Sequence, residues 1–325
     1  MKHLLSIAAL LSAFSSASFA NSSLPGLAEF IDEMHQKQQF DKAQLNAVFA
    51  DVEVKESILK AISRPAEKSK PWYDYRKIFI TDKRIKGGVN FWQHNAEALA
   101  KAEQQYGVPA EIIIAILGVE TSYGGNVGSY RVIDALSTLA FRYPQRSKFF
   151  RSELGHFLAL TREEGMSMLS PVGSYAGAMG LGQFMPSSYR DYAVDFDGDG
   201  RRNIWTNRTD AIGSIANYLA RHGWQRGEPI AHTTSVIGSV PTALLKKGNK
   251  PALSPVELKQ AGVSLNAVPD DAKKVALITL TQPQGEEYWV TRQNFYSITR
   301  YNHSRMYAMA VTQLAEAIRL QHEQN

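Results

Sequence analysis

Glu120 is the first residue whose setting suggests chemistry, because it ends one of the most apolar stretches of the chain, Ile112 to Val119. At helical spacing Glu120 shares a face with three of these side chains, Ile113, Ile116 and Leu117. A carboxyl in apolar surroundings is partly desolvated, and desolvation raises its pKa towards the range that a general acid needs near neutral pH. The same residues also allow a buried structural carboxyl, satisfied by backbone N–H groups or by an arginine.

A second candidate is the segment Gly173 to Gly182, which is rich in glycine and alanine. Small residues let another chain or a ligand approach the backbone closely. Ser174 in this segment and Gln183 directly after it are neutral hydrogen-bonding groups suited to amides and hydroxyls. The segment is equally compatible with a tightly packed loop that binds nothing.

A third candidate is an acidic loop, in which Asp195, Asp197 and Asp199 occupy positions 1, 3 and 5 and a glycine occupies position 6. This spacing matches the first half of the EF-hand loop, whose oxygen ligands hold calcium. Position 12, usually a bidentate Glu, is Thr206, and Asp210 supplies the missing carboxylate only if the loop is longer. A solvated acidic turn is the alternative, but three carboxylates this close repel each other without a cation.

The composition is that of an ordinary globular protein, with 44% hydrophobic and 21% charged residues. A formal net charge of +5 favours a polyanionic partner. Nucleic acid is not expected, because the basic residues are dispersed and no recognition-module signature is present. Peptidoglycan is compatible with this charge, since its lactyl and peptide groups carry carboxylates.

Residues 1–20 have the pattern of a cleaved signal peptide: Lys2 precedes the apolar run Leu4 to Phe14, and the small-residue site Ser18-Phe19-Ala20 follows. That run is shorter than the roughly 20 apolar residues of a lasting anchor, and no later stretch comes close. The chain has no cysteine, which excludes disulfides and a lipid on an N-terminal cysteine. We therefore expect a soluble, periplasmic protein that begins near Asn21 and does not span the membrane, rather than a cytosolic protein with an apolar N-terminal helix.

Helices are the main elements expected around these residues. Apolar residues recur at helical spacing from Leu24 to about Ser63, with Asp41 as an N-cap between two helices. One helix is expected over 90–106, and the next over 110–120, closed by Gly124-Gly125.

The second half of the chain mixes helices with short β-prone runs. Two helices are expected over 134–164 and another over 209–222. Val275 to Leu280 and Glu287 to Arg292 are predicted to form a hairpin. A terminal helix is expected over 300–321. The predicted fold class is α+β, mainly α, with a small β subdomain late in the chain.

The three candidate features, in this order, resemble the lytic murein transglycosylase B family from about Trp72 to the C-terminus. The family's catalytic glutamate lies in a Val-Glu-Thr sequence at a helix end, matched by Val119-Glu120-Thr121. Two family stretches, Ser-Tyr-Ala-Gly-Ala-Met-Gly and Gly-Gln-Phe-Met-Pro-Ser-Ser-Tyr, match at 174–180 and 182–189.

The resemblance implies a structural metal site, with calcium expected and sodium as the alternative. The family's lengthened EF-hand loop matches at 195–210, and its ligands fall on Asp195, Asp197, Asp199, the Arg201 carbonyl and Asp210. Between Trp205 and Asp210 the chain has one residue more than the family pattern. This insertion affects the match of Asp210 to the family's last metal ligand.

The resemblance also implies a lysozyme-like helical core, with a flanking α domain and a small β domain. The corresponding limits are an N-terminal α domain over 21–92, a catalytic core over 93–226, a β domain over 227–298 and a C-terminal helix over 299–325, which packs on the α domain. Family sites for the glycan fall on Ser174, Gln183, Phe184, Tyr218, Tyr301, Asn302, Tyr307 and, more loosely, Tyr75. Without the resemblance these tyrosines are read as ordinary packing.

The implied reaction is cleavage of the β-1,4 bond between N-acetylmuramic acid and N-acetylglucosamine without water, which leaves a 1,6-anhydro end. One carboxyl then suffices, whereas most glycosidases need two. A hydrolytic muramidase is the rival enzyme and needs a second carboxylate, such as Glu153 or Asp191. A glycan-binding module without activity is the non-enzymatic rival. The expected partners are peptidoglycan strands and cell-wall synthesis proteins, and the chain is expected to be a monomer.

Overall fold

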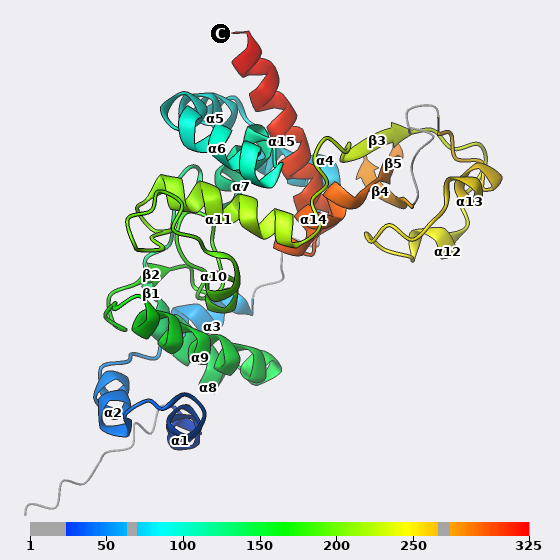
Figure 1. The fold of residues 1–325 in the computed structure, drawn as a ribbon. Helices are drawn as coiled ribbons and strands as arrows, with labels where there is room; N and C mark the ends of the chain where they lie inside the picture. The colour runs from blue at the N-terminus through cyan, green and yellow to red at the C-terminus, as the bar shows by residue number, and fades with distance from the viewer. Residues whose placement is uncertain (1–23, 64–69, 266–273, 325) are drawn as a thin grey trace, which may run out of the picture.

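Helices are the predominant elements of the computed structural model, which describes residues 24–63, 70–265 and 274–324 (Figure 1). The signal peptide expected over 1–20 lies outside the described residues. Among the described residues, no helix is both long and apolar enough to cross a membrane. The predicted domain limits at 92, 226 and 298 stay predictions.

Three short helices begin the described chain; α1 and α2 lie at one end of the molecule, opposite the end of the last helix, whereas α3 packs on α8 (Val132–Arg142) further in (Figure 1). They are α1 Leu27–Gln38, α2 Lys42–Ala50 and α3 Glu56–Ile62. The predicted N-cap is confirmed, because the Asp41 carboxylate accepts a hydrogen bond from the Gln44 N–H at 2.7 Å.

The central helices follow, and one stretch that was predicted to form a single helix forms parts of two. The elements are α4 Trp72–Phe79, α5 Asp82–His94, α6 Ala96–Tyr106 and α7 Ala110–Thr121. The single helix predicted over 90–106 is therefore wrong. Asn95 interrupts it with φ −132° and ψ 24°, and its Nδ2 donates to the Phe91 carbonyl at 2.7 Å. Asparagine competes with the helix backbone in this way, so it was the signal for the break.

Helix α7 lies in the middle of the main hydrophobic core. Every residue from Ile112 to Gly118 is buried, and α5, α6, α11 (Arg208–Arg221) and α15 (Arg305–Glu323) pack around the helix. A helix that is apolar on all sides is stable only inside such a shell. The core thus fixes the position of the helix that ends at Glu120.

The segment between α7 and α11 contains two helices that pack on each other and a loop-rich stretch. Its elements are β1 Tyr130–Arg131, α8 Val132–Arg142, the 3-10 turn η2 Pro144–Arg146, α9 Ser147–Glu163, β2 Val172–Gly173 and α10 Pro186–Tyr192. The two helices predicted over 134–164 and the helix predicted over 209–222 are confirmed. Strands β1 and β2 pair antiparallel and lead into the glycine-rich loop.

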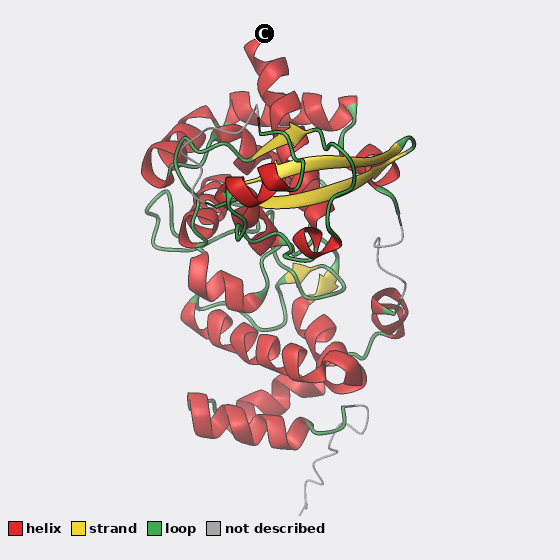
Figure 2. Ribbon diagram, turned by 90° about the vertical axis from the view of Figure 1, so that its right-hand side faces the viewer, coloured by secondary structure: helices red, strands yellow, loops and turns green. Residues whose placement is uncertain are grey.

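A three-stranded antiparallel sheet forms the small β subdomain, in the order β3-β5-β4 (Figure 2). Its elements are β3 Ala231–Thr234, α12 Thr242–Leu245, α13 Pro255–Gln260, β4 Ala276–Gln282 and β5 Gly285–Thr291. The predicted hairpin is confirmed, with Gln282 paired to Gly285 across the turn. This subdomain has an apolar cluster of its own, which includes Leu253, Leu258 and Val290.

The chain closes with two helices: the terminal helix predicted over 300–321 is present, but it begins only at Arg305, and a separate helix precedes it. Helix α14 runs over Gln293–Tyr301, and α15 over Arg305–Glu323. Asn302 takes an extended conformation, and Ser304 begins α15 by accepting the Tyr307 N–H at 3.4 Å. Because of this break, Tyr301 lies at the end of α14 and Tyr307 in the first turn of α15, on either side of the corner between the two helices. The predicted fold class, α+β and mainly α, is confirmed.

Candidate active site

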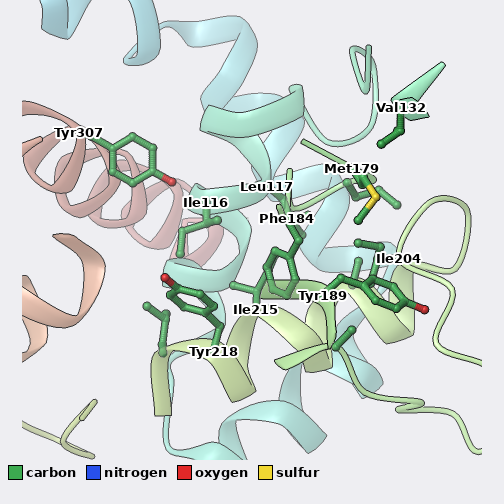
Figure 3. Close-up of a cluster of buried hydrophobic side chains, with 14 of the residues drawn as sticks. Ile116, Leu117, Val132, Met179, Phe184, Tyr189, Ile204, Ile215, Tyr218 and Tyr307 are labelled. Atoms are coloured by element: carbon green, nitrogen blue, oxygen red, sulfur yellow. The ribbon is translucent and has the colours of Figure 1, made fainter. Parts of the chain in front are cut away.

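Glu120 lies in the last turn of α7, where its carboxylate accepts a hydrogen bond from the Tyr307 hydroxyl at 2.6 Å. Figure 3 shows Tyr307 projecting from α15 towards α7, beside Ile116. Burial raises the pKa of Glu120 to about 7, and the hydrogen bond from Tyr307 opposes this shift. The carboxyl is therefore protonated in a large fraction of molecules at neutral pH, as a general acid must be.

The chain turns directly after α7, before it reaches the glycines that were predicted to end this helix. Ser122 and Tyr123 both have positive φ, 50° and 63°, so the helix ends before Gly124 is reached. The Ser122 N–H donates to the Gly118 carbonyl, and the Tyr123 N–H donates to the Leu117 carbonyl. The Tyr123 hydroxyl then donates to the Arg84 carbonyl at 2.7 Å. These contacts hold the helix end on α5.

Thr121 joins this helix end to the glycine-rich loop. Its hydroxyl donates to the Leu181 carbonyl at 2.9 Å and accepts the Gly124 N–H at 3.0 Å. On its other side the loop meets the acidic loop, because the Leu181 N–H donates to the Ile204 carbonyl at 2.9 Å. A Cβ on Gly180 would lie 2.5 Å from that carbonyl oxygen, so the close approach requires glycine.

Ser174 and Gln183 brace the glycine-rich loop. The Ser174 hydroxyl accepts the Ala178 N–H at 3.1 Å. Gln183 has a φ of 52°, and its side-chain amide donates to the carbonyls of Gly180 at 2.9 Å and Val127 at 3.2 Å. Both residues remain partly accessible.

Three aromatic residues predicted from the sequence pack together in this region. The ring centroids of Phe184, Tyr218 and Tyr301 lie between 4.8 and 5.8 Å apart. The Tyr301 hydroxyl donates to the Gly182 carbonyl at 2.5 Å, and the Tyr218 hydroxyl donates to the Arg300 carbonyl at 2.6 Å. Figure 3 shows Phe184 and Tyr218 near the end of α7. Phe184 and Tyr218 are buried, whereas Tyr301 keeps an accessible face.

Tyr75 and Asn302, the two remaining predicted residues, lie in different surroundings. Tyr75 is buried on α4, packed against Trp72 and Phe79. Burial raises the pKa of Tyr307 well above its ordinary value, and Glu120, Tyr301 and Tyr75 add smaller effects in the same direction. Asn302 is exposed at the corner between α14 and α15.

The structure adds two aromatic residues that sequence reasoning missed. His222 stacks on Tyr218, with ring centroids 4.1 Å apart, and Tyr192 lies 4.8 Å from Tyr218. The His222 Nδ1–H donates to the Tyr218 carbonyl at 2.7 Å. The i, i+4 spacing of Tyr218 and His222 on one helix was the available signal.

The carboxylates considered for a hydrolytic mechanism have other surroundings. Glu153 is buried, and its two oxygens accept the Ser187 N–H at 2.9 Å and the Ser187 hydroxyl at 2.8 Å. Glu153 therefore caps the start of α10. Asp191 is exposed on α10.

The acidic loop brings together Asp195, Asp197 and Asp210, each with a carboxylate oxygen within 4.8 Å of the others. Asp210 is fully buried and accepts the N–H groups of Phe196 at 2.8 Å and Asn203 at 2.7 Å. The extra residue before Asp210 thus does not keep it away from the other carboxylates. An all-oxygen donor set of this kind suits a hard cation such as calcium.

Asp199 and Arg201, the other two predicted ligands, are exposed. The Asp199 carboxylate lies outside the three-carboxylate cluster and accepts the Arg201 N–H at 2.9 Å. A hydrogen bond from the Asn207 side chain lowers the pKa of Asp197. Asp197 therefore stays ionised at neutral pH, ready to hold a cation.

Comparison with known proteins extends the resemblance to nearly the whole chain. The family model for the transglycosylase SLT domain matches residues 22–316. The chain is 44% identical over 311 residues to the membrane-bound lytic murein transglycosylase B of Escherichia coli K12, covering 93% of this chain and 84% of that protein.

Solved structures agree with this match. The soluble lytic transglycosylase SltB1 of Pseudomonas aeruginosa superposes with a TM-score of 0.86 and 53% identity, covering 92% of this chain and all of that one. Escherichia coli Slt35 in complex with calcium gives 0.84 and 42%, covering 94% and 95%. Pseudomonas aeruginosa SltB3 in complex with NAG-anhNAM-pentapeptide gives 0.78 and 29%, covering 90% and 79%. The chain therefore belongs to the lytic murein transglycosylase B family, whose enzymes act on peptidoglycan.

Proposed function

We propose that Glu120 is the single catalytic carboxyl of this transglycosylase and that it acts first as acid and then as base. The bond cleaved is the β-1,4 bond from N-acetylmuramic acid to N-acetylglucosamine. Protonated Glu120 donates its proton to the leaving glycosidic oxygen as the bond to C1 breaks. The resulting carboxylate removes the proton of the C6 hydroxyl, whose oxygen forms the new bond to C1. The proton returns to Glu120, and the product carries a 1,6-anhydro end.

The observation that carries this proposal is the environment of one carboxyl. Glu120 has apolar surroundings, one hydrogen-bond donor in Tyr307 and a pKa of about 7. A hydrolytic enzyme needs a second carboxylate to activate water or to attack the sugar, but Glu153 is engaged by Ser187. The C6 hydroxyl belongs to the same sugar, so it reacts without a second carboxylate to position it. The complex of SltB3 with NAG-anhNAM-pentapeptide, a ligand that carries an anhydro sugar, supports the same chemistry.

We assign the binding of the sugar at the cleaved bond to the residues around Glu120. Ser174 and Gln183 present polar groups from a loop that hydrogen bonds fix in place. Tyr301 offers its accessible aromatic face to a sugar ring, buried Tyr218 supports Tyr301 by packing against it, and Asn302 hydrogen-bonds the glycan. Tyr307 and Tyr75 are assigned no contact with the sugar; they hold the Glu120 carboxyl in position.

We infer that Asp195, Asp197 and Asp210 hold a calcium ion, with further oxygens from Asp199 and the Arg201 carbonyl. Bound calcium supplies charge compensation for these carboxylates and takes no part in the cleavage. The Slt35 structure in complex with calcium supports this inference. Sodium is the alternative ion, and melting curves in each salt separate the two.

We also infer that the enzyme works in the periplasm after cleavage before Asn21. The pattern in residues 1–20 supports export, and relatives are named both as soluble and as membrane-bound. N-terminal sequencing of the protein from a periplasmic fraction tests this. An N-terminus at Met1 would contradict it.

Mass spectrometry of the muropeptides released from purified peptidoglycan tests the catalytic proposal. We expect anhydro ends, which are one water lighter than hydrolysed ends, and no release by Glu120→Gln. Hydrolysed ends would instead assign the protein a muramidase mechanism. Release by Glu120→Gln would remove the residue from the mechanism.

A further inference from the structure

A cavity of about 410 Å³ lies between the end of α9, strand β2 and the acidic loop. Its wall includes Pro171 and Val172 beside β2, and Arg201 and Trp205 of the acidic loop. Trp205 belongs neither to the three-carboxylate cluster nor to the aromatic group of Phe184, Tyr218 and Tyr301. The cavity therefore has an aromatic wall to which the proposed function assigns no role.

The Trp205 ring is held in a fixed position from behind. Its indole N–H donates to the Val172 carbonyl at 3.1 Å, and its ring packs on Tyr189 with the centroids 5.6 Å apart. Tyr189 is fully buried, and its hydroxyl donates to the Arg202 carbonyl at 2.5 Å. Trp205 itself is only partly buried, and it lines the cavity. A fixed aromatic ring binds the apolar face of a ligand with little loss of side-chain entropy.

An accessible surface connects this cavity with the sugar site proposed beside Glu120. Gly173 is buried, whereas Val172 before it is 37% exposed and Ser174 after it is partly accessible. Successive side chains of an extended chain point to opposite faces, so Val172 and Ser174 share the outer face, about 7 Å apart. Tyr175, which is 40% exposed, follows Ser174 directly. A glycan strand that leaves Ser174 along this face reaches the cavity at Val172.

Arg201 supplies hydrogen-bond donors at the same cavity. The Arg202 guanidinium is paired with the Glu164 carboxylate at 2.5 Å, but the exposed Arg201 side chain has no ion pair or hydrogen bond among the described residues. A guanidinium offers N–H donors and no acceptor. An N-acetylated sugar combines an apolar ring face with hydroxyl and acetamide oxygens. An aromatic ring beside an unpaired donor therefore suits such a sugar better than a purely apolar ligand.

We propose that this cavity is a distal sugar site, which binds an N-acetylated sugar of the glycan strand beyond the sugars at the cleaved bond. One face of that sugar lies on Trp205, and Arg201 donates to its acetamide or hydroxyl oxygens. The inference rests on the proposed function, because it requires a glycan strand that passes Ser174 beside Glu120. The contact involves the sugar ring and not the stem peptide. The enzyme accordingly favours long glycan strands over short ones, even when both lack peptides.

The test compares two lengths of peptide-free glycan, tetrasaccharides and octasaccharides. For the wild-type enzyme we expect a lower KM on the octasaccharides. Trp205→Leu should raise that KM about tenfold, as expected when one aromatic contact is lost, and leave kcat and the KM on tetrasaccharides unchanged. Arg201→Gln should give a smaller rise, of about threefold. Arg208→Gln, an exposed arginine at the start of α11 and outside the cavity wall, is the matched control.

A binding measurement separates this inference from the catalytic proposal. Octasaccharides titrated into Glu120→Gln should bind more tightly than tetrasaccharides, even if the protein cleaves nothing. Adding Trp205→Leu to that variant should remove the difference, and adding Arg201→Gln should reduce it. Melting curves show whether the Trp205 variant folds. The exposed Arg201 side chain makes Arg201→Gln the decisive variant if it does not.

Two results would overturn the distal sugar site. They are equal wild-type KM values on the two lengths, and equal losses on both lengths in the folded variants. Tetrasaccharides would still be cleaved to anhydro products in that case, so the role of Glu120 would stand. Hydrolysed ends from both lengths would instead refute the proposed function, and the titrations into Glu120→Gln would still decide whether the cavity binds a sugar.

Discussion

Two sites in this protein place carboxyls in different surroundings, one with a single carboxyl and the other with a cluster. Glu120 is alone at the end of an apolar helix, and burial raises its pKa to about 7. The acidic loop gathers three carboxylates within 4.8 Å, and hydrogen bonding lowers the pKa of Asp197. Burial raises the pKa of Asp210 as well, but two N–H hydrogen bonds to its carboxylate oppose this shift, and a cation shared with Asp195 and Asp197 would stabilise its charged form. Glu120 has no such cluster around it, so its proton exchanges near neutral pH. The environment rather than the residue type therefore distinguishes the proposed acid/base from the proposed metal ligands.

Glu120→Gln is the sharpest test of that contrast. The amide keeps the size of the side chain but cannot donate and recover a proton, so we expect turnover to fall at least about a thousandfold. The variant should fold, with a melting temperature at neutral pH at least as high as that of the wild type. Release of muropeptides and thermal unfolding are measured on the same preparation, with Asp191→Asn on exposed α10 as control. Comparable losses in both variants would contradict a special role for Glu120.

The pH dependence of stability should carry the signature of Glu120. Its folded pKa of about 7 exceeds the ordinary value of 4.5, so the folded chain binds more protons than the unfolded chain between these values. The stability from this group is complete below pH 4.5 and is lost as pH rises to 7, by up to about 3 kcal/mol. Urea unfolding from pH 4.5 to 8 should show this loss in the wild type relative to Glu120→Gln. Parallel curves would mean that Glu120 titrates normally.

Removal of the metal should destabilise the protein without changing the acid/base group. A chelator should lower the free energy of unfolding by about 2.7 kcal/mol if calcium was present at a hundred times its dissociation constant. That corresponds to a fall in melting temperature of roughly 5–10 °C. Calcium should restore the wild type but not Asp210→Asn. An unchanged melting curve in chelator would remove calcium from the acidic loop.

Tyr307→Phe gives the smallest of these effects and tests the link between α15 and the acid. The lost hydrogen bond lowers the pKa of Glu120 in the wild type, so that pKa should rise in the variant. The limb of the kcat/KM profile assigned to Glu120 should move to higher pH by about one unit, which corresponds to a hydrogen bond of about 1.4 kcal/mol. A profile that stays in place would show that Tyr307 does not tune the acid.

Local patterns in the sequence predicted the parts of the fold that depend on near neighbours. The hairpin of β4 and β5, the Asp41 cap and the apolar stretch before Glu120 are examples. The two errors, over 90–106 and at the start of 300–321, arose where polar residues interrupt an otherwise helical run. Asn95 and Asn302 break those runs through their backbone conformations, which hydrophobic periodicity does not report.

The sequence by itself determined the candidates, because the order and spacing of Glu120, the glycine-rich loop and Asp195 to Asp210 are local properties. Only the tertiary structure decided what surrounds them. Tyr307 lies 187 residues from Glu120 along the chain, and Thr121 is 60 residues from Leu181. The tertiary structure also places Glu153 where it caps the start of α10 and not beside Glu120 as a second catalytic group. Such contacts depend on how helices pack, and packing is set by the whole core at once rather than by any one segment.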